Sequence, residues 1–189
     1  MKNLDPTGLK RLHRDWRRMT TQQISLILDS VQTPYNVGTI IRTSAALGVE
    51  HLWLVGATES PNHNKTNKTA MGTQRYVDWT AVETPTEAVA AAREQGYTIV
   101  GVELADNAVP LHELDLAGKV CLVVGHEDRG LSKEVLALCD QVGYIPQVGK
   151  VGSLNVGVAT SIAISEARRQ GWMASVSYTH LTLPTICSV

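Results

Sequence analysis

Residues 120–170 read VCLVVGHEDRGLSKEVLALCDQVGYIPQVGKVGSLNVGVATSIAISEARRQ, and this stretch decides the fold. It contains two apolar runs, at 120–124 and 142–145, which are suited to buried strands. A helix is predicted between them over 132–139, and a second helix of small residues over 155–170. Each strand is followed by a loop rich in glycine and polar groups, and in α/β sheets ligands bind at the carboxyl ends of strands. The stretch therefore predicts a ligand pocket where two strands end close together.

The same alternation of strand and helix extends back to residue 24. The further predicted elements are strands at 24–28, 51–55 and 97–102 and helices at 37–47 and 84–95. Continuous runs of Val, Ile and Leu are typical of a mostly parallel sheet that helices cover on both faces. Residues 24–170 are therefore expected to form one α/β domain.

Irregular structure and one helix cap are predicted between these elements. The segments 57–69 and 105–118 are rich in polar or turn-forming residues, and neither is expected to form a helix or strand. Asn36 is predicted to cap the helix that starts at Val37, since asparagine is favoured at helix N-caps.

Residues 1–23 form a polar, basic segment. Residues 1–20 contain six Lys and Arg against two Asp, although the whole chain has a formal net charge of −1. Such a cluster can neutralise RNA phosphates, and Arg14, Arg17 and Arg18 are the candidate contacts. A solvated helix face is the alternative interpretation.

The last stretch, residues 171–189, breaks the pattern of the domain. It contains no Lys, Arg, Asp or Glu and follows no helical period. We interpret it as a non-native or disordered tail and exclude it from the predicted domain. A true edge strand is the alternative interpretation.

Several classes of protein are disfavoured by what the sequence lacks. It has no G-x-G-x-x-G after a strand, no G-x-x-x-x-G-K-[ST] and no set of kinase motifs, which disfavours dinucleotide oxidoreductases and P-loop enzymes. Its three cysteines have neither C-x-x-C spacing nor histidine partners, so we expect no metal and no disulfide framework. No apolar run approaches membrane-spanning length, and no signal peptide is recognisable. We therefore expect a cytoplasmic protein without a membrane partner.

Three short segments carry polar residues that suggest chemistry. The first is Asn36-Val-Gly38-Thr-Ile-Ile-Arg42, at the start of a predicted helix. Gly38 is expected to let another part of the chain approach the helix closely. Arg42 lies among apolar and small residues, where a guanidinium is costly unless it faces a polar pocket, a carboxylate or a phosphate. An arginine that points into solvent is the alternative.

The second and third segments follow the two strands of the opening stretch. In Gly125-His-Glu127-Asp-Arg-Gly-Leu-Ser, the glycine permits a tight turn, and the carboxylate suits the start of the next helix. The third segment is Ile145-Pro-Gln followed by Ser153-Leu-Asn155, where serine and asparagine suit a helix N-terminus with free donors nearby. A surface turn and a plain helix cap are the respective alternatives.

Together the three segments resemble the three motifs of the SpoU, or TrmH-like, branch of the SPOUT RNA methyltransferases. N-x-G-x-x-x-R at 36–42 resembles the first motif and G-x-E-x-x-G-L-S at 125–132 the second. I-P followed by S-L-N-V, within 145–156, resembles the third. The resemblance covers residues 24–170.

This resemblance implies a sheet whose C-terminal part is threaded into a trefoil knot, a homodimer, and S-adenosylmethionine bound in a bent form among the knot loops. The cofactor contacts that it implies, largely through backbone groups, are Gly125, Ile145 and Leu154. It implies that Arg42 is the central catalytic residue and reaches a pocket built partly by the other subunit. The residues that it implies orient Arg42, the ribose and the methyl donor are Asn36, Glu127, Ser153 and Asn155.

The function that the resemblance implies is methylation of a ribose 2′-hydroxyl in RNA, with S-adenosylmethionine as methyl donor and without a metal. Residues 68–72 and 75–79 look most like the tRNA 2′-O-methyltransferases, so tRNA is the expected substrate. Lys65 and Lys68 are expected to bind the RNA backbone together with the basic N-terminal segment. The alternatives are a related enzyme that acts on ribosomal RNA and a noncatalytic RNA-binding protein on the same fold.

Two residues depart from the family motifs. Gln147 stands where the third motif usually has Met, and Gly157 stands where it has Ser. Glycine inside a helix costs up to about 1 kcal/mol relative to alanine, and we expect Gly157 to allow close packing. Neither position touches the expected catalytic groups, so activity is still expected.

Overall fold

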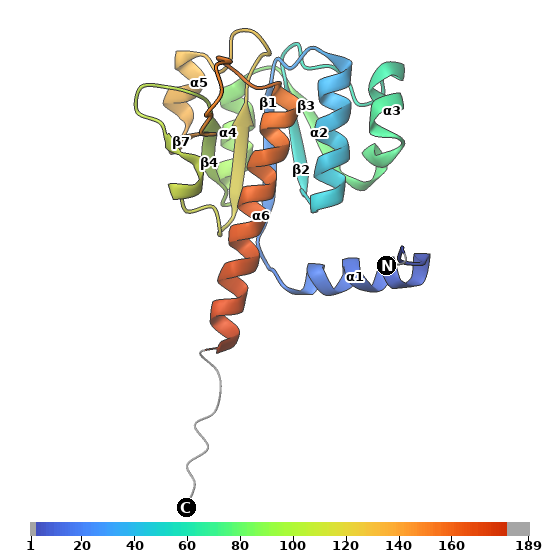
Figure 1. Cartoon of the computed structure of the whole chain (residues 1–189). Helices are drawn as coiled ribbons and strands as arrows, with labels where there is room; N and C mark the ends of the chain where they lie inside the picture. The colour runs from blue at the N-terminus through green and yellow to red at the C-terminus, as the bar shows by residue number, and fades with distance from the viewer. Residues whose placement is uncertain (1–2, 181–189) are drawn as a thin grey trace, which may run out of the picture.

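The computed structural model describes residues 3–180, with side chains described up to residue 175. Its centre is a seven-stranded sheet in the order β3-β2-β1-β6-β4-β7-β5, and each pairing among the described strands is parallel (Figure 1). The strands are β1 Ile24–Asp29, β2 His51–Val55, β3 Asp78–Val82, β4 Thr98–Val102, β5 Val109–Pro110, β6 Val120–Val124 and β7 Gln141–Tyr144. The helices are α1 Pro6–Arg18, α2 Pro34–Leu47, α3 Asn64–Ala70, α4 Pro85–Glu94, α5 Lys133–Leu138 and α6 Val156–His180, with 3-10 helices η1 Thr73–Tyr76 and η2 Leu111–Glu113. The α/β class predicted from the sequence is confirmed.

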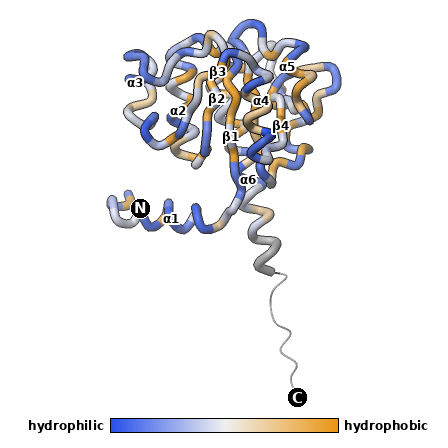
Figure 2. The backbone as a smooth tube through the Cα atoms, turned by 180° about the vertical axis from the view of Figure 1, so that it is seen from behind, coloured by the Kyte–Doolittle hydropathy of each residue, from blue (hydrophilic) through white to orange (hydrophobic). Residues whose placement is uncertain are grey.

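Strands β1 and β6 form the middle of the sheet because both are continuous apolar runs. They pair in register from Ile24 opposite Val120 onward, and β6 is buried along its whole length. Successive side chains of a strand point to opposite faces of the sheet. Leu26 therefore joins the core beneath α2 and α6, whereas Ile27 joins the core beneath α4 and α5. Figure 1 shows α6 in front of the sheet and α4 behind it, and Figure 2 shows β1 as a hydrophobic strand in the middle, so the predicted cover on both faces is confirmed.

Helix α2 begins earlier than the sequence predicts. It starts at Pro34, since proline suits the first turn of a helix, and its N-cap is Thr33. The prediction that Asn36 caps this helix is therefore wrong, because Asn36 lies inside the first turn. Its side chain is consequently free to make contacts with other parts of the chain.

Helices and strands also occur in segments that were predicted to be irregular. The segment 57–69 contains most of α3, and 105–118 contains β5 and η2. Strand β3 was not predicted because it is an edge strand, where exposed Asp78 and Thr80 interrupt the apolar run. These elements lie at the rim of the domain, where burial imposes little pattern on the sequence.

Helix α6 continues to His180, past Gln170, where the sequence predicts its end. Residues 171–180 are thus helical, in place of the edge strand that was the alternative interpretation. In this extension, the ring centroid of Trp172 lies 4.7 Å from that of Trp16 on α1. Residues 181–189 of the expected tail lie outside the described residues, and the non-native origin of 171–189 remains a prediction.

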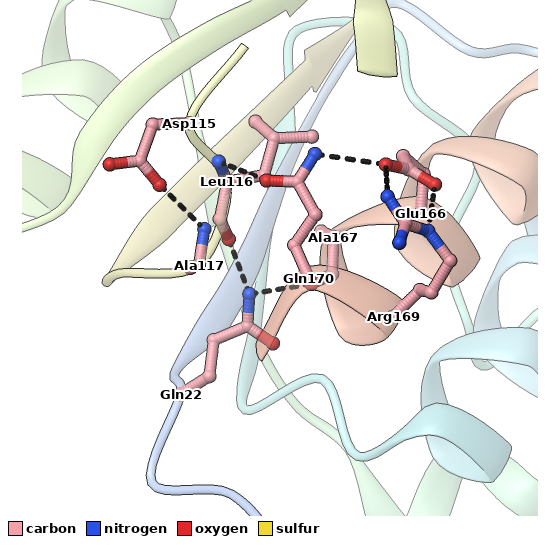
Figure 3. A network of polar contacts seen from close by, with 8 residues as sticks. All are labelled: Gln22, Asp115, Leu116, Ala117, Glu166, Ala167, Arg169 and Gln170. Carbon is pink, nitrogen blue, oxygen red and sulfur yellow. Dashed lines mark hydrogen bonds and ion pairs between the residues drawn. The ribbon is translucent and has the colours of Figure 1, made fainter. Parts of the chain in front are cut away.

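A polar network fastens α6 to the segments that precede β1 and β6 (Figure 3). Gln22 Nε2 donates to the carbonyl oxygen of Ala167 at 2.8 Å and also to the carbonyl oxygen of Leu116. Gln170 Oε1 accepts from the backbone N–H of Leu116 at 2.9 Å, and Gln170 also donates to Glu166. The second half of α6 is therefore held against the end of the sheet where the central strands begin.

Gly38 allows α2 and α3 to pack closely. A Cβ atom on Gly38 would lie 2.6 Å from Thr69 Cβ and 2.8 Å from the carbonyl oxygen of Thr66, both on α3, so the prediction that Gly38 permits close approach is confirmed. A Cβ atom on Gly157 would lie 3.4 Å from Thr39 Cβ on α2, which is an ordinary van der Waals distance. The prediction that Gly157 allows close packing therefore stays a prediction.

Gly38→Ala should destabilise the protein, because the new methyl group would meet the backbone of α3. Overpacking of this kind costs about 1–3 kcal/mol, against a gain of about 1 kcal/mol from helix propensity. We expect the free energy of unfolding in urea to fall by up to about 2 kcal/mol. Gly118→Ala is the control, since a Cβ there would have no neighbour within 4 Å. Equal effects of the two substitutions would contradict the packing role of Gly38.

Candidate active site

A cavity of about 280 Å³ lies at the carboxyl ends of β4, β6 and β7, where the sequence predicts a ligand pocket. Its walls include the strand ends and the loops that follow β6 and β7. The predicted cofactor contacts Gly125, Ile145 and Leu154 all line it, together with Glu127 and Ser153. Segments that are far apart in the sequence therefore surround one cavity.

The loop after β6 is folded tightly on itself and presents backbone to the cavity. A Cβ atom on Gly125 would lie 2.3 Å from the carbonyl oxygen of Gly130, so only glycine fits at position 125. The loop closes through a hydrogen bond of 2.9 Å from the Gly130 N–H to the His126 carbonyl, with Gly130 at φ +61°. Glu103, at the end of β4, accepts from the Leu131 N–H at 2.8 Å and so ties the loop to the sheet.

A chain of hydrogen bonds joins the three motifs beside this cavity. Asn36 Nδ2 on α2 donates to Glu127 Oε1 at 3.0 Å, and Asn36 Oδ1 accepts from Asn155 Nδ2 at 2.9 Å. Asn155 Oδ1 in turn accepts from the backbone N–H groups of Gly157 and Val158 at the start of α6. Both ends of the Asn36 amide are thereby engaged, and the orientation of this nearly buried side chain is fixed.

Glu127 contacts the N-terminus of α2 as well as Asn36. Its carboxylate accepts from the backbone N–H of Thr33 at 2.9 Å and from that of Gln32 at 3.3 Å. Partial burial alone would raise the pKa of Glu127, but the hydrogen bonds from Asn36 and Thr33 lower it to about 2. Glu127 is therefore ionised at neutral pH and is a weak base, so it is suited to hold other groups in place.

Arg42 lies apart from the cavity of its own chain. It is exposed on α2, about 9 Å further along the helix axis than Asn36. Its Nη1 atom lies 2.8 Å from the sulfur of Met71, which follows α3. The structure thus brings together Asn36, Glu127 and Asn155, with Ser153 on the cavity wall, but it does not bring Arg42 to them.

The residues predicted to bind RNA lie in two places. Arg14, Arg17 and Arg18 are exposed on α1, which leaves the body of the protein where β1 begins (Figures 1 and 2). In α1, whose residues are all described, no side chain is buried. Lys65 and Lys68 are exposed on α3, which packs beside α2. All five side chains are accessible, and their roles in binding remain predictions.

Two residues at the site were missed by the sequence analysis. Glu103 lines the cavity, and its only sequence signal is a polar residue directly after an apolar run. Met71 contacts Arg42 through its sulfur, and its backbone has a left-handed conformation, with φ +54°, which no local sequence pattern indicates.

Among residues 3–180, no group of three or more His, Cys, Asp or Glu is arranged to hold a metal ion. In the same residues, no helix has the length and hydropathy of a membrane span.

Comparisons with known proteins find similar sequences and structures among RNA-modifying enzymes. A sequence model of the SpoU rRNA Methylase family matches residues 23–165. The tRNA (guanosine(18)-2′-O)-methyltransferase of Escherichia coli K12 is 36% identical over 147 residues, which are 78% of this chain and 63% of that protein. This chain therefore spans less than two thirds of the length of that relative.

Two solved structures are similar throughout the domain. The A. aeolicus TrmH/SpoU tRNA modifying enzyme has a TM-score of 0.74 at 30% identity, covering 94% of this chain and 90% of that one. The AdoMet-bound rRNA methyltransferase from Sinorhizobium meliloti has a TM-score of 0.74 at 29% identity, covering 87% of this chain and 70% of that one. The described fold is thus that of these enzymes.

Glu127→Gln should lower the free energy of unfolding at pH 7 by about 1–3 kcal/mol, after allowance for solvent screening. The pKa of Glu127 is about 2 in the folded protein, below the 4.5 of the free group. Its contribution to stability is therefore fully present above about pH 4.5 and is lost as the pH falls toward 2. Urea unfolding of both proteins at a series of pH values measures this loss.

The two stability curves should converge in acid. Glu94→Gln, on the exposed surface of α4, is the matched control and should change stability by less than about 0.5 kcal/mol. A difference between wild type and Glu127→Gln that stays constant from pH 7 to pH 2 would show that the charge of Glu127 contributes nothing.

Proposed function

The chain belongs to the SpoU rRNA Methylase family, and we propose that it transfers a methyl group from S-adenosylmethionine to a ribose 2′-hydroxyl in RNA. The observation that carries the proposal is the hydrogen-bonded chain Glu127–Asn36–Asn155, which joins all three motifs beside one cavity. The substrate class that we propose is tRNA, and the compartment is the cytoplasm. A ribosomal RNA substrate is the second candidate, because the Sinorhizobium meliloti rRNA methyltransferase has the same TM-score as the A. aeolicus enzyme.

The residues around the cavity fit S-adenosylmethionine. The glycine turn at Gly125 exposes backbone that a side chain would otherwise cover. Ile145 and Leu154 would supply apolar wall for an adenine ring, and the acidic residues Glu103 and Glu127 are among the residues that line the cavity, which suits a cationic ligand. When bound, the cofactor supplies a methyl group already activated by its positively charged sulfur.

The protein's own residues are proposed to position groups rather than to form covalent intermediates. Asn36, fixed at both ends of its amide, would keep the start of α2 in register with the cavity. Glu127 would act as a permanent anion that holds Asn36, since a carboxylate with a pKa of about 2 takes up protons poorly at neutral pH. Most of the rate enhancement would then come from proximity and alignment.

Arg42 is proposed to bind the RNA phosphate and to stabilise negative charge that develops on the ribose oxygen. A guanidinium stays protonated at neutral pH, so it serves better as a cation than as a base. Arg42 would offset charge on the 2′-oxygen as this oxygen takes the methyl group, which the cofactor's sulfur would release. The hydroxyl proton would leave late, to water.

We propose that Arg42 acts in the cavity of a second copy of the chain. Two observations support a homodimer of this kind. Arg42 is exposed and lies outside its own chain's cavity. On α6, beside that cavity, the apolar side chains of Val158 and Ile162 lie one turn apart and are 47% and 40% exposed, as expected for a face that a partner covers.

Arg42→Ala should lower kcat for methyl transfer to tRNA by about 10²- to 10³-fold, because one donor to the developing charge is lost. The measurement is incubation of an unfractionated tRNA pool with radiolabelled S-adenosylmethionine, followed by nuclease digestion and mass spectrometry of the methylated riboses. Cofactor affinity, measured by calorimetry, should stay within threefold of wild type. If the variant methylates RNA at the wild-type rate, Arg42 has no role in the mechanism. If the wild type binds the cofactor but does not methylate RNA, a noncatalytic RNA-binding protein is favoured.

Mixed dimers test whether Arg42 acts across the interface. Arg42→Ala and Asn155→Ala are each expected to be inactive alone. Refolding the two variants together should give mixed dimers with about half of the activity of a wild-type dimer. One of the two sites in each mixed dimer then has both an intact cavity and an intact arginine. If Arg42 acted within its own chain, each site would lack one group and the mixture would stay inactive.

A further inference from the structure

The segment before β3 forms a positively charged surface that the proposed mechanism leaves unused. Residues 60–76 contain Lys65, Lys68 and Arg75 and no Asp or Glu. All three basic side chains are exposed. Tyr76, at the end of η1, is 63% exposed, although an aromatic ring of this size is usually at least half buried.

Arg75 and Tyr76 form a preassembled stack. The Arg75 guanidinium carbon lies 4.7 Å from the centroid of the Tyr76 ring, which is the geometry of a cation–π contact. Arg75 Nη2 also donates to the Tyr76 hydroxyl at 2.7 Å. The guanidinium lies over the ring, and Tyr76 as a whole still leaves more than half of its surface open to solvent.

The element that carries this stack packs against the helix that carries Arg42. Both α3 and η1 pack against α2. Within this unit, the Thr73 hydroxyl donates to the Ala70 carbonyl at 2.7 Å, and Gln74 donates to Asn67. Met71 joins the unit to Arg42 through the contact of its sulfur with the guanidinium. Arg42 and the stack are therefore carried by elements that pack against one another.

We infer that Arg75 and Tyr76 are a stacking platform for an unpaired nucleobase of the RNA substrate. Unpaired bases stack on aromatic rings and on guanidinium planes, and the surrounding cations attract the backbone of the same strand. The inference rests on the proposed function, and it adds a substrate property: the modified ribose lies in a single-stranded or looped region whose neighbouring base can leave its own stack.

Substitutions of Tyr76 test the platform directly. Tyr76→Ala should weaken binding of an unfractionated tRNA pool to the full-length chain by about 5- to 100-fold, the range for loss of one stacked base. Tyr76→Phe and Tyr76→Trp retain a ring and should stay within about threefold of wild type. Because stacking involves no counterion release, Tyr76→Ala should leave the dependence of binding on salt concentration unchanged. The measurement is fluorescence anisotropy of labelled tRNA at several salt concentrations.

A second cation–aromatic pair provides the charge control. Lys119 lies with its Nζ atom 4.5 Å from the ring centroid of Tyr97, whose ring is nearly completely buried and so offers no platform. Lys119→Ala and Arg75→Ala each remove one positive charge. Only Arg75→Ala should weaken tRNA binding by more than about threefold. Unchanged calorimetric affinity for S-adenosylmethionine in every variant verifies that the fold is intact.

Three outcomes would overturn the platform. One is that the wild type methylates tRNA and Tyr76→Ala binds tRNA as tightly as the wild type does. The proposed function would then stand without the platform. Another is equal weakening by Tyr76→Phe and Tyr76→Ala. The third is a loss of dimer in Tyr76→Ala, measured by light scattering, since the ring would then serve contacts between copies of the chain. A wild type that neither binds nor methylates RNA would instead refute the proposed function itself.

Discussion

The carboxylate of Glu127 at the N-terminus of α2 connects the two halves of the domain. Glu127 follows β6 and α2 follows β1, and these neighbouring strands are parallel, so the two segments meet at the carboxyl ends of the central strands. A helix N-terminus carries partial positive charge and free N–H groups, both of which favour a carboxylate there. Asn36 and, through it, Asn155 take their orientation from this contact. The arrangement of all three motifs around the cavity therefore depends on it.

The other end of α2 is held by a cation. Buried Arg168 on α6 donates to the carbonyl oxygens of Leu47 and Gly48 at 3.0 Å each, and to that of Gln22 at 3.1 Å. Burial lowers the pKa of Arg168, and nearby Glu50 acts in the opposite direction. Its charge matches the partial negative charge of a helix C-terminus, and the carbonyl groups satisfy its donors. Helix α2 is thus fixed at both ends by side chains of opposite charge.

Because α2 is fixed in this way, its two ends can have the different roles that we propose, one near the cofactor cavity and the other near the RNA. Its first turn lies beside the cavity, where Asn36 hydrogen-bonds to Glu127 on the cavity wall. Its later turns carry Arg42 outward, next to the basic and aromatic surface of α3 and η1. The chain has almost no net charge, so any attraction for RNA comes from local clusters such as these. In this proposal, a complete site requires two copies of the chain.

Local pattern was sufficient for the elements that lie in the core. Strand β6 has the bounds that its apolar run predicts, and α4 differs by a single residue at each end, because burial imposes a regular pattern on such sequences. Residue types at fixed spacing were sufficient to single out Gly125, which lines the cavity, and Asn155, which hydrogen-bonds to Asn36 beside it. The edge strand β3 escaped prediction, since a strand with one exposed side needs no continuous apolar run.

Long-range contacts were beyond the reach of the sequence. Asn36 and Asn155 are separated by 119 positions, and their hydrogen bond exists because the strand order brings β1, β6 and their following segments together. The same holds for Glu127. The sequence predicted that its carboxylate lies at the start of the helix that follows it, but the carboxylate instead accepts hydrogen bonds at the start of α2. Amino-acid types and periodicity thus determined the elements and the chemical groups. The packing of distant elements decided which groups meet, because that depends on strand order and helix orientation, which local patterns do not encode.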